Sequence, residues 1–316
     1  MMMNVSYAII IPTLNAEPFI SALLVSILQY DDSLREKIVI VDSESTDGTI
    51  SILRRAGVSR IHSVPRDQFD HGGTRTEIAA QCPEDVLIFM TQDVVLVDHF
   101  SIKNLLSPLA DPCVAAVYGR QLPLSESTLF ASHLRLFNYP ACSYIRTFDE
   151  RSKYGIKTPF LSNSFAAYRR SALEEIGWFK NGMLIGEDIH AGGRLLMAGY
   201  CLAYAADACA YHAHNYNIFE EFGRYFDTGA MHAMEPWIKK TFGSADREGW
   251  RFLRSEWRYF LQNRAYGKIP EMTLRILAKY FGYKLGGAYK YIPCALLQRF
   301  SMHPAWWVKN LEHAKL

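Results

Sequence analysis

One stretch of the sequence, residues 85–98, constrains the fold most strongly. It begins with the apolar run Val86–Met90, continues as Thr91-Gln92-Asp93 and becomes apolar again at Val94. A short run of branched and aromatic residues is typical of a strand that is buried on both faces. An acid that follows such a strand lies at the edge where open parallel sheets bind ligands. Asp93 is therefore a candidate functional acid; a helix cap or a solvated loop carboxylate is the alternative from this stretch alone.

Similar apolar runs recur elsewhere in the chain, with helical patterns between them. They predict strands at residues 7–12, 37–41, 61–64 and 158–168, an amphipathic helix whose apolar face runs from Ile20 to Leu28, and a helix at 74–80. Strands that alternate with helices form a parallel sheet with right-handed crossovers, so the sequence predicts an α/β fold. The chain lacks the GxGxxG fingerprint of dinucleotide-binding proteins and the GxxxxGK[ST] phosphate loop.

A second acid, Asp42, follows the strand predicted at 37–41. A carboxylate at a strand end can accept the imide N–H of uracil or thymine, a donor that adenine lacks. Ser45, Thr46 and Asp47 can cap the helix that follows. The alternative is an ordinary polar turn between a strand and a helix, and the sequence leaves both interpretations open.

Residues 66–75 combine three potential donors with a glycine pair. Arg66, His71 and Arg75 surround Gly72-Gly73, which permits a close approach of the backbone to a ligand. Cationic and donor groups at the start of a helix suit a diphosphate or an acidic sugar nucleotide. A solvated turn whose arginines form surface ion pairs is the alternative.

Two further clusters lie later in the chain. Glu187 and Asp188 precede a predicted helix, where acids are either functional or simply favourable partners of the helix dipole. His212 and His214 follow a run of small residues that we interpret as a strand, and residues two apart on a strand share a face. One of these histidines can then bind a metal while the other tunes it.

The C-terminal segment differs from the rest of the chain in charge. From Asp246 to Leu316 it has 13 Lys/Arg and 5 Asp/Glu, net +8, whereas the preceding residues have 21 and 27, net −6. Basic residues interleaved with tyrosine and tryptophan suit a helix in a membrane interface. A helical core with snorkelling lysines or a dimer surface is the alternative. We expect no nucleic-acid partner, because no motif supports one.

The targeting and redox features predict a cytoplasmic protein. The apolar run at 8–11 is too short for a signal peptide, and no stretch approaches the roughly 18 apolar residues that span a bilayer. We expect peripheral attachment to the cytoplasmic face of the inner membrane. The six cysteines show no CxxC spacing, so we expect reduced, core-type thiols.

Taken in order, these motifs resemble the family 2 glycosyltransferases, which have the GT-A fold. The matching pieces cover about the first 215 residues and are Ile-Pro-Thr-Leu-Asn-Ala-Glu at 11–17, Val-Asp-Ser-Glu-Ser-Thr-Asp-Gly-Thr at 41–49, Thr-Gln-Asp at 91–93, Gly-Glu-Asp at 186–188 and Tyr-His at 211–212. The Gln-Phe-Asp-His-Gly-Gly-Thr-Arg and His-Ala-His-Asn-Tyr segments further resemble bacterial rhamnosyltransferases of O-antigen and related surface polysaccharides.

The resemblance implies a Rossmann-like, mixed and mostly parallel sheet flanked by helices, with a C-terminal helical extension. It implies a catalytic domain at 1–217 and a helical region at 218–316, on the acceptor and membrane side. Asp188 matches the catalytic base. Asp93 and His212, with His214 as the alternative, match the ligands of Mg²⁺ or Mn²⁺, although Thr91 replaces the first acid of the DxD motif. The implied substrate contacts are Thr13, Glu17, Asp42, Arg66, His71, Arg75, Thr91, Gln92 and Glu187.

The implied reaction is an inverting, metal-dependent transfer of L-rhamnose from dTDP-L-rhamnose to a polyprenyl-diphosphate-linked saccharide. A UDP-galactose or UDP-galactofuranose donor is an alternative within the family. A nucleotidyltransferase is a further alternative, but its glycine-rich loop after the first strand is missing at Pro12-Thr13-Leu14-Asn15. A non-catalytic glycan-binding module would have no need of Asp42, Asp93 and Asp188 together.

Overall fold

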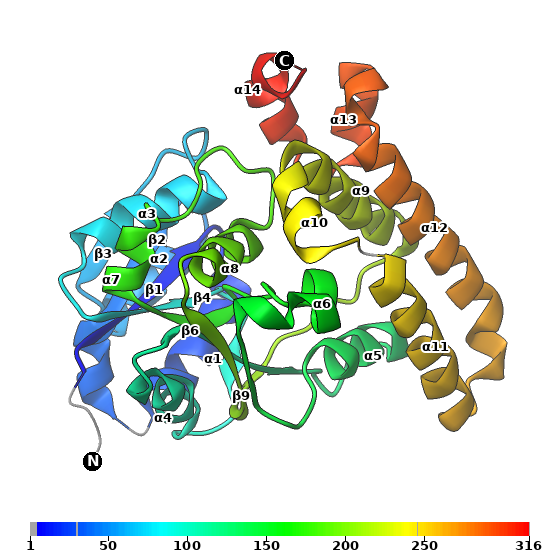
Figure 1. Cartoon of the computed structure of the whole chain (residues 1–316). Helices are drawn as coiled ribbons and strands as arrows, with labels where there is room; N and C mark the ends of the chain where they lie inside the picture. The colour runs from blue at the N-terminus through cyan, green and yellow to red at the C-terminus, as the bar shows by residue number, and fades with distance from the viewer. Residues whose placement is uncertain (1–4, 30, 245, 316) are drawn as a thin grey trace.

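The computed structural model describes residues 5–29, 31–244 and 246–315 (Figure 1). Its centre is a nine-stranded sheet of order β3-β2-β1-β4-β8-β6-β9-β5, with β7 paired to β9. The strands are β1 (Tyr7–Thr13), β2 (Ile38–Asp42), β3 (Arg60–Ser63), β4 (Val86–Met90), β5 (Val95–Leu96), β6 (Val114–Leu122), β7 (Tyr144–Arg146), β8 (Phe165–Arg169) and β9 (Cys201–Tyr211).

Helices cover both faces of the sheet and form the C-terminal part of the chain. The helices of the sheet half are α1 (Glu17–Leu28), α2 (Thr49–Arg55), α3 (His71–Gln81), α4 (Ser101–Leu106), α5 (Leu129–Asn138), α6 (Arg151–Tyr154), α7 (Arg170–Glu175) and α8 (Glu187–Met197). The later helices are α9 (Ile218–Met234), α10 (Pro236–Phe242), α11 (Asp246–Gln262), α12 (Ile269–Gly287), α13 (Cys294–Phe300) and α14 (Pro304–Lys315).

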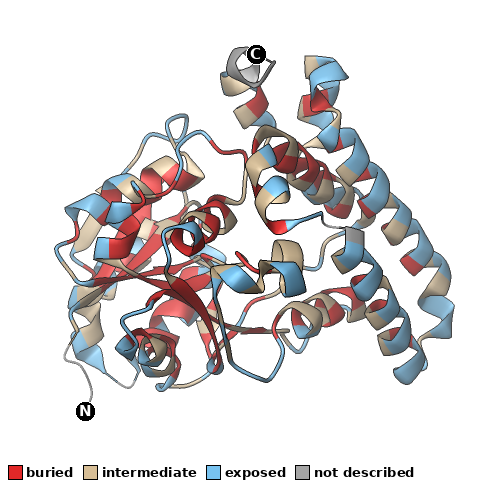
Figure 2. Ribbon diagram, viewed as in Figure 1, coloured by how far each residue is buried: buried red, intermediate tan, exposed pale blue. Residues whose placement is uncertain are grey.

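The predicted α/β architecture, a mixed sheet with flanking helices, is confirmed. Strands β3, β2, β1 and β4 are mutually parallel, and β8 enters the sheet antiparallel to both β4 and β6. Every residue of β2 and β4 is buried, because each strand packs on both faces (Figure 2). The carboxyl ends of β1, β2 and β4 consequently meet at one edge of the sheet, which is where the candidate acids were predicted.

Several local predictions are corrected. Helix α3 begins at His71 rather than at Thr74, because the Asp70 side chain caps it and accepts from the Gly73 backbone N–H. The glycine pair therefore lies in the first helical turn, where a Cβ on Gly72 would be 1.9 Å from the Lys180 carbonyl oxygen. Of the strand predicted at 158–168, only the end forms β8, and β9 stops at Tyr211, so His212 and His214 follow the strand in a loop.

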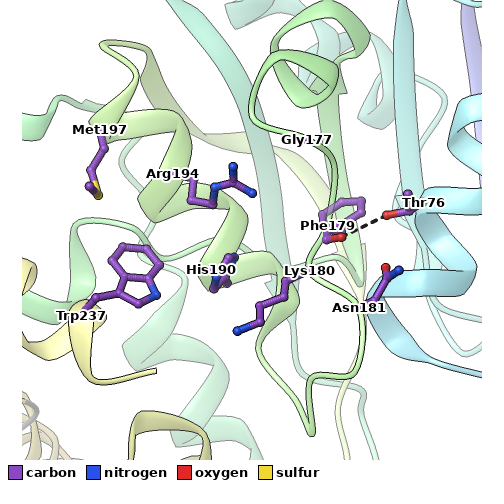
Figure 3. Close-up of a pocket in the computed structure, with 9 residues that line it drawn as sticks. All are labelled: Thr76, Gly177, Phe179, Lys180, Asn181, His190, Arg194, Met197 and Trp237. Atoms are coloured by element: carbon purple, nitrogen blue, oxygen red, sulfur yellow. Dashed lines mark hydrogen bonds between the residues drawn. The ribbon is translucent and has the colours of Figure 1, made fainter. Parts of the chain in front are cut away.

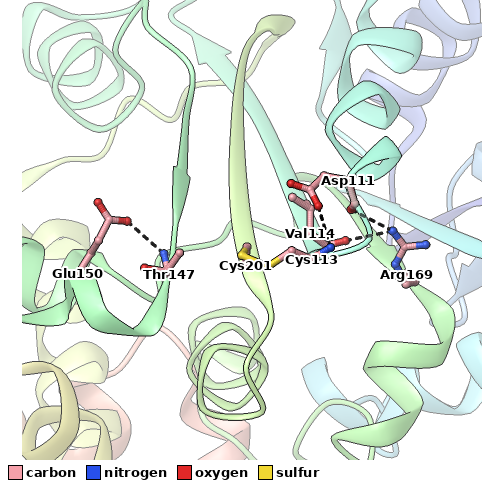
Figure 4. Close-up of a disulfide and its surroundings, with 7 residues drawn as sticks. All are labelled: Asp111, Cys113, Val114, Thr147, Glu150, Arg169 and Cys201. Atoms are coloured by element: carbon pink, nitrogen blue, oxygen red, sulfur yellow. Dashed lines mark hydrogen bonds between the residues drawn. A yellow bond between two sulfur atoms is a disulfide. The ribbon is translucent and has the colours of Figure 1, made fainter.

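The prediction that all six cysteines are thiols is wrong for one pair. Cys113 and Cys201 form a disulfide, with their Cα atoms 5.4 Å apart (Figure 4). The reason is topological: β6 and β9 are neighbouring parallel strands and begin side by side, with Val114 in register with Cys201. A sequence separation of 88 residues concealed this proximity. Cys82, Cys142, Cys209 and Cys294 are free.

The C-terminal helices form a bundle that also returns to the sheet half. Helices α9 and α12 pack closely because glycines line their contact: a Cβ on Gly286 would lie 1.9 Å from the Phe226 carbonyl oxygen. Helix α14 buries Trp307, and Lys309 Nζ donates to the Asp67 carbonyl oxygen at 3.2 Å. Among the helices in the described part of the chain, none has the length and hydropathy needed to cross a membrane.

Candidate active site

Asp42 ends β2 beside Thr13, which ends β1 in register with it. Both residues are buried, and the Thr13 hydroxyl donates to Asp42 Oδ1 at 2.8 Å. Ser45 supplies two further hydrogen bonds, from its hydroxyl to Oδ1 at 2.6 Å and from its backbone N–H to Oδ2 at 2.8 Å. A carboxylate offers about four acceptor positions, so these three donors leave one position on Oδ2 for an external donor.

Glu17 and Gln92 tie the neighbouring loops to this strand edge. Glu17 Oε2 accepts from the Gly48 backbone N–H at 2.7 Å. The Gln92 amide accepts from the Leu14 backbone N–H at 2.8 Å and donates to the Leu14 carbonyl oxygen at 3.2 Å. The Gln92 amide therefore fixes the loop after β1 against the end of β4, next to Asp93, instead of pointing freely at a ligand.

Asp93, His212 and His214 form one cluster at the ends of β4 and β9. Asp93 Oδ2 lies 3.4 Å from His212 Nε2 and 3.5 Å from His214 Nε2, and the potential ligand atoms all lie within 4.8 Å of one another. Two ligands about 2.1 Å from one cation are about 3 Å apart, so this spacing fits a shared ion. The motifs offered His212 or His214 as the partner of Asp93, whereas the structure brings both histidines to it.

The pKa shifts of Asp93, His212 and His214 favour the protonation states that bind a cation. Burial would raise the pKa of Asp93, but its interactions with His212, the Thr91 hydroxyl and His214 hold that pKa well below its usual range. Burial lowers the pKa of His214 to about 4, with the His212 ring acting in the same direction. Burial also lowers the pKa of His212 despite the nearby carboxylate. Neutral imidazole nitrogens beside an ionised carboxylate are a donor set for a divalent metal.

Asp188 and Glu187 lie in the first turn of α8. Gly186 precedes them with a φ of 81°, a left-handed conformation that glycine adopts without strain. Asp188 Oδ1 accepts from the Ile189 backbone N–H at 2.8 Å, and Oδ2 accepts from the Asn163 backbone N–H at 3.2 Å. Glu187 Oε1 accepts from the Asn163 side-chain amide at 3.1 Å and lies 3.2 Å from Arg75 Nη1.

The two adjacent acids have opposite pKa shifts. Burial, followed by the charge of Glu187, raises the pKa of Asp188 to about 7. Burial also acts to raise the pKa of Glu187, but Arg75 and His71 outweigh it and lower that pKa. Glu187 therefore stays ionised, and Asp188 can exchange a proton near neutral pH, which is the property of a general base.

A chain of contacts joins the Asp93–His212–His214 cluster to this acid pair. His212 Nδ1 lies 2.8 Å from Gln121 Oε1, and Gln121 Nε2 donates to the Ser162 hydroxyl at 2.9 Å. Ser162 is followed by Asn163, which contacts both acids. The Thr91 backbone N–H also donates to the Ser164 carbonyl oxygen at 3.3 Å. The short segment 162–164 thus links the surroundings of Asp93 to those of Asp188.

The remaining predicted residues lie nearby in different settings. Arg75 is buried against Glu187 and donates to the His71 carbonyl oxygen at 2.8 Å, so it lies beside the acid pair. The His71 ring packs edge-on against His303, with ring centroids 5.3 Å apart. Arg66 is exposed, and its backbone N–H donates to Glu44 Oε2 at 3.2 Å.

A separate surface pocket of about 640 Å³ lies beside α8 (Figure 3). The described residues that line it do not include Asp42, Asp93 or Asp188. They are Thr76, Gly177, Phe179, Lys180, Asn181, His190, Arg194, Met197 and Trp237.

Comparison with known proteins identifies the class of protein to which this chain belongs. Residues 8–177 match the model of the family described as Glycosyl transferase family 2. The chain therefore belongs to glycosyltransferase family 2 and is an enzyme of that class.

Two relatives match nearly the whole chain. It is 41% identical over 307 residues to the O-antigen chain rhamnosyltransferase RfbN of Salmonella typhimurium, covering 97% of each chain. It is 39% identical over 310 residues to the O-antigen chain rhamnosyltransferase WbaN of Salmonella anatum, covering 98% of each. The resemblance to rhamnosyltransferases predicted from the motifs is confirmed.

Solved structures support the fold. One is the mannosyltransferase PcManGT from Pyrobaculum calidifontis in complex with GDP-Man and Mn²⁺, at a TM-score of 0.57 and 21% identity over 97% of this chain and 87% of that one. Another is S. aureus TarS in complex with UDP-GlcNAc, at a TM-score of 0.54 and 16% identity over 98% and 88% of the two chains. At these identities the similarity concerns architecture alone.

Proposed function

We propose that this enzyme transfers L-rhamnose from dTDP-L-rhamnose to a polyprenyl-diphosphate-linked saccharide, with inversion at the anomeric carbon. The observation that carries the proposal is the linkage of the Asp93–His212–His214 cluster and the Asp188 carboxylate through residues 162–164. The full-length similarity to two O-antigen chain rhamnosyltransferases supports rhamnose as the sugar.

In this proposal Asp42 recognises the base. The acceptor position left on its carboxylate suits the imide N–H of thymine, which a thymidine nucleotide presents as a uridine nucleotide does. The three hydrogen bonds from Thr13 and Ser45 hold the carboxylate in place before the nucleotide arrives. Pre-organisation of this kind reduces the ordering cost of binding.

Asp93, His212 and His214 would hold Mg²⁺ or Mn²⁺, and two imidazole ligands favour Mn²⁺ of the two. When bound, the cation neutralises charge on the diphosphate leaving group as a Lewis acid. The protein supplies the orientation of the three ligands, with His212 held from behind by Gln121.

Asp188 would remove the proton from the acceptor hydroxyl. The acceptor oxygen forms a bond to the anomeric carbon while the bond from that carbon to the diphosphate oxygen breaks, and the nucleoside diphosphate leaves with the electron pair. One base acting on one face gives a single displacement and inversion. From a β-linked rhamnose nucleotide, the product is an α-rhamnoside. The backbone N–H groups of Asn163 and Ile189 orient Asp188, and Arg75 compensates the charge of Glu187.

We also infer that the outer face of α11 and α12 lies on an anionic membrane surface. Both helices form the outer edge of the molecule and expose most of that face (Figure 2). Large apolar side chains exposed there are Trp250, Trp257, Leu261, Leu274, Leu277, Tyr280 and Phe281. The exposed basic residues Arg251, Arg254, Arg258 and Lys284 lie on the same two helices, as an interfacial helix requires.

The test is transfer of rhamnose from dTDP-L-rhamnose to a lipid extract that contains the polyprenyl-linked acceptor, followed by mass spectrometry and anomeric analysis of the product. We expect an α-rhamnosylated lipid and metal-stimulated turnover. Parallel reactions with UDP-galactose and UDP-galactofuranose distinguish the alternative donors. Transfer of either of those sugars, without transfer of rhamnose, would overturn the proposal.

A further inference from the structure

Gln121 occupies a position behind the metal cluster that none of the sequence motifs indicated. It lies near the end of β6, and only 1% of its surface is exposed. Its side-chain oxygen Oε1 is 2.8 Å from His212 Nδ1 and accepts a hydrogen bond from Arg135 Nη1, also at 2.8 Å. Arg135 belongs to α5 and is itself buried.

The hydrogen-bond partners determine which way the Gln121 amide faces. Arginine can only donate, so the amide oxygen must be the atom that faces Arg135. The amide nitrogen faces the Ser162 hydroxyl at 2.9 Å, which can accept. Because Oε1 can only accept, the Nδ1 atom of His212 must carry the proton that fills the contact between them. The Nε2 atom of a neutral His212 then carries the lone pair, and Nε2 is the atom that faces Asp93.

The opposite tautomer would have a different consequence. With the proton on Nε2, His212 would donate to the Asp93 carboxylate at 3.4 Å, and its metal-binding lone pair would point away from the cluster. A hydrogen bond from the second ring nitrogen commonly selects the tautomer of a metal-binding histidine. Here that partner is a neutral amide that a buried arginine holds in a single orientation.

We propose that Gln121, fixed by Arg135, is a positioning residue that keeps His212 in the Nδ1–H tautomer and so keeps Nε2 available to a divalent cation. The inference rests on the proposed metal dependence for its functional meaning, but the tautomer itself is independent of the sugar donor and of turnover. Through Ser162, the same amide also reaches the segment that holds Asp188.

Two substitutions separate positioning from packing. Gln121→Met keeps the length of the side chain and removes the acceptor, whereas Gln121→Glu keeps an acceptor for both Arg135 and His212. Thr158→Val is the matched control, because Thr158 is also buried and its hydroxyl donates to the Gly155 carbonyl oxygen at 2.7 Å rather than to a residue of the cluster. Thermal unfolding of all three variants establishes that they are folded.

The first measurement is the affinity of the full-length protein for Mn²⁺, followed by electron paramagnetic resonance. Loss of an outer hydrogen bond to a metal-binding histidine typically weakens metal binding by about 10–100-fold. We expect a loss of that size in Gln121→Met, with Gln121→Glu and Thr158→Val within about threefold of the wild type. Equal affinity in Gln121→Met and the wild type would overturn the role of Gln121 in metal binding.

The second measurement is the tautomer of His212 in the metal-free protein, from the nitrogen chemical shifts of ¹⁵N-histidine-labelled samples. The His212 signals are assigned by their loss in His212→Ala. We expect the Nδ1–H pattern in the wild type and in Gln121→Glu, and its loss in Gln121→Met. An Nε2–H pattern in the wild type would overturn the inference. If the wild type bound no Mn²⁺ but showed the expected tautomers, the proposed metal dependence would fail and the tautomer assignment would stand.

Discussion

At the scale of single residues, Asp188 has a different environment from its neighbour Glu187. Arg75 compensates Glu187, whereas Asp188 accepts from two backbone N–H groups and lies beside a negative charge. Burial, followed by the charge of Glu187, raises the pKa of Asp188 to about 7, although the two backbone hydrogen bonds act in the opposite direction. A base with this pKa is protonated below pH 7 and cannot then accept a proton from the acceptor, so kcat/KM should rise with pH through about 7 and level off above it.

Substitution of this residue tests the assignment. In Asp188→Asn we expect kcat to fall by about 10²–10⁴-fold, because the side chain can no longer accept the proton. Binding of dTDP, measured by calorimetry, should remain within about threefold of the wild type. The pH-dependent rise should disappear from any residual activity. A variant with undiminished kcat would show that another group is the base.

Metal removal gives a second prediction at this scale. Chelation with EDTA should abolish transfer by the wild type, and added Mn²⁺ should restore it, because Asp93 and the two histidines form the proposed donor set. Asp93→Asn should lose at least about 10-fold in Mn²⁺ affinity, since the anionic ligand is removed. Asp149→Asn is the matched control, because the Asp149 side chain is 98% exposed to solvent. Metal-stimulated turnover in Asp93→Asn equal to that of the control would contradict the site.

The candidate acids were predictable from sequence, but their supporting residues were not. Asp42 and Asp93 follow apolar runs that are recognisable as strands, and parallel strands place their ends together. Asn163 and Gln121 lack such a signal, since the partners that give them their roles lie 14 to 91 positions away in the sequence. The sequence hint for Gln121 is weak: a polar residue near the end of an otherwise buried strand.

At the scale of secondary-structure elements, the buried face of a helix could be predicted from the local sequence pattern. The contacts between elements could not. The buried face of α1, with Ile20, Leu23, Leu24 and Ile27, is the face predicted from periodicity. The disulfide between β6 and β9 and the close crossing of α9 and α12 depend on which elements become neighbours. A pattern of period 3.6 identifies the face of a helix but not its partner.

The α9–α12 contact offers a matched pair of substitutions. Gly286→Ala would place a methyl group against the backbone of α9, whereas a methyl group on Gly287 would have no neighbouring atom within 4 Å among the described residues. We expect Gly286→Ala to lower the free energy of unfolding by about 1–3 kcal/mol, as overpacking does. Gly287→Ala should be neutral or slightly stabilising because alanine favours a helix. Denaturant titration compares them, and equal stabilities would exclude a tight crossing.

At the scale of the whole molecule, the basic and aromatic C-terminal helices predict a surface for lipid. Two aromatic residues on α12 are more than half exposed, Phe281 at 54% and Tyr280 at 56%. If each ring that leaves water contributes about 1 kcal/mol, Tyr280→Ser/Phe281→Ser should weaken binding to vesicles by roughly tenfold or more. Co-sedimentation with vesicles of phosphatidylethanolamine and phosphatidylglycerol measures the effect.

Phe19→Ser is the control for this experiment, because Phe19 is 46% exposed on α1, outside the C-terminal helices. It should bind vesicles as the wild type does. High salt should weaken binding of every variant, since the basic side chains contribute through their charge. If the wild type does not sediment with vesicles but forms a dimer in light scattering that the double substitution disrupts, the face is a dimer surface instead.

Helix α14, the last helix of the chain, contacts the sheet half through the loop that contains Asp67. One of the last segments to be synthesised therefore packs against one of the first. Trp307 is fully buried, His303 packs against His71, and Lys309 reaches the carbonyl oxygen of Asp67 across a sequence separation of 242 residues. During translation, the segments that carry Asp42 and Asp93 leave the ribosome long before α14 is made. The contacts of His303 with His71 and of Lys309 with Asp67 can therefore form only after residues 303–309 have been synthesised.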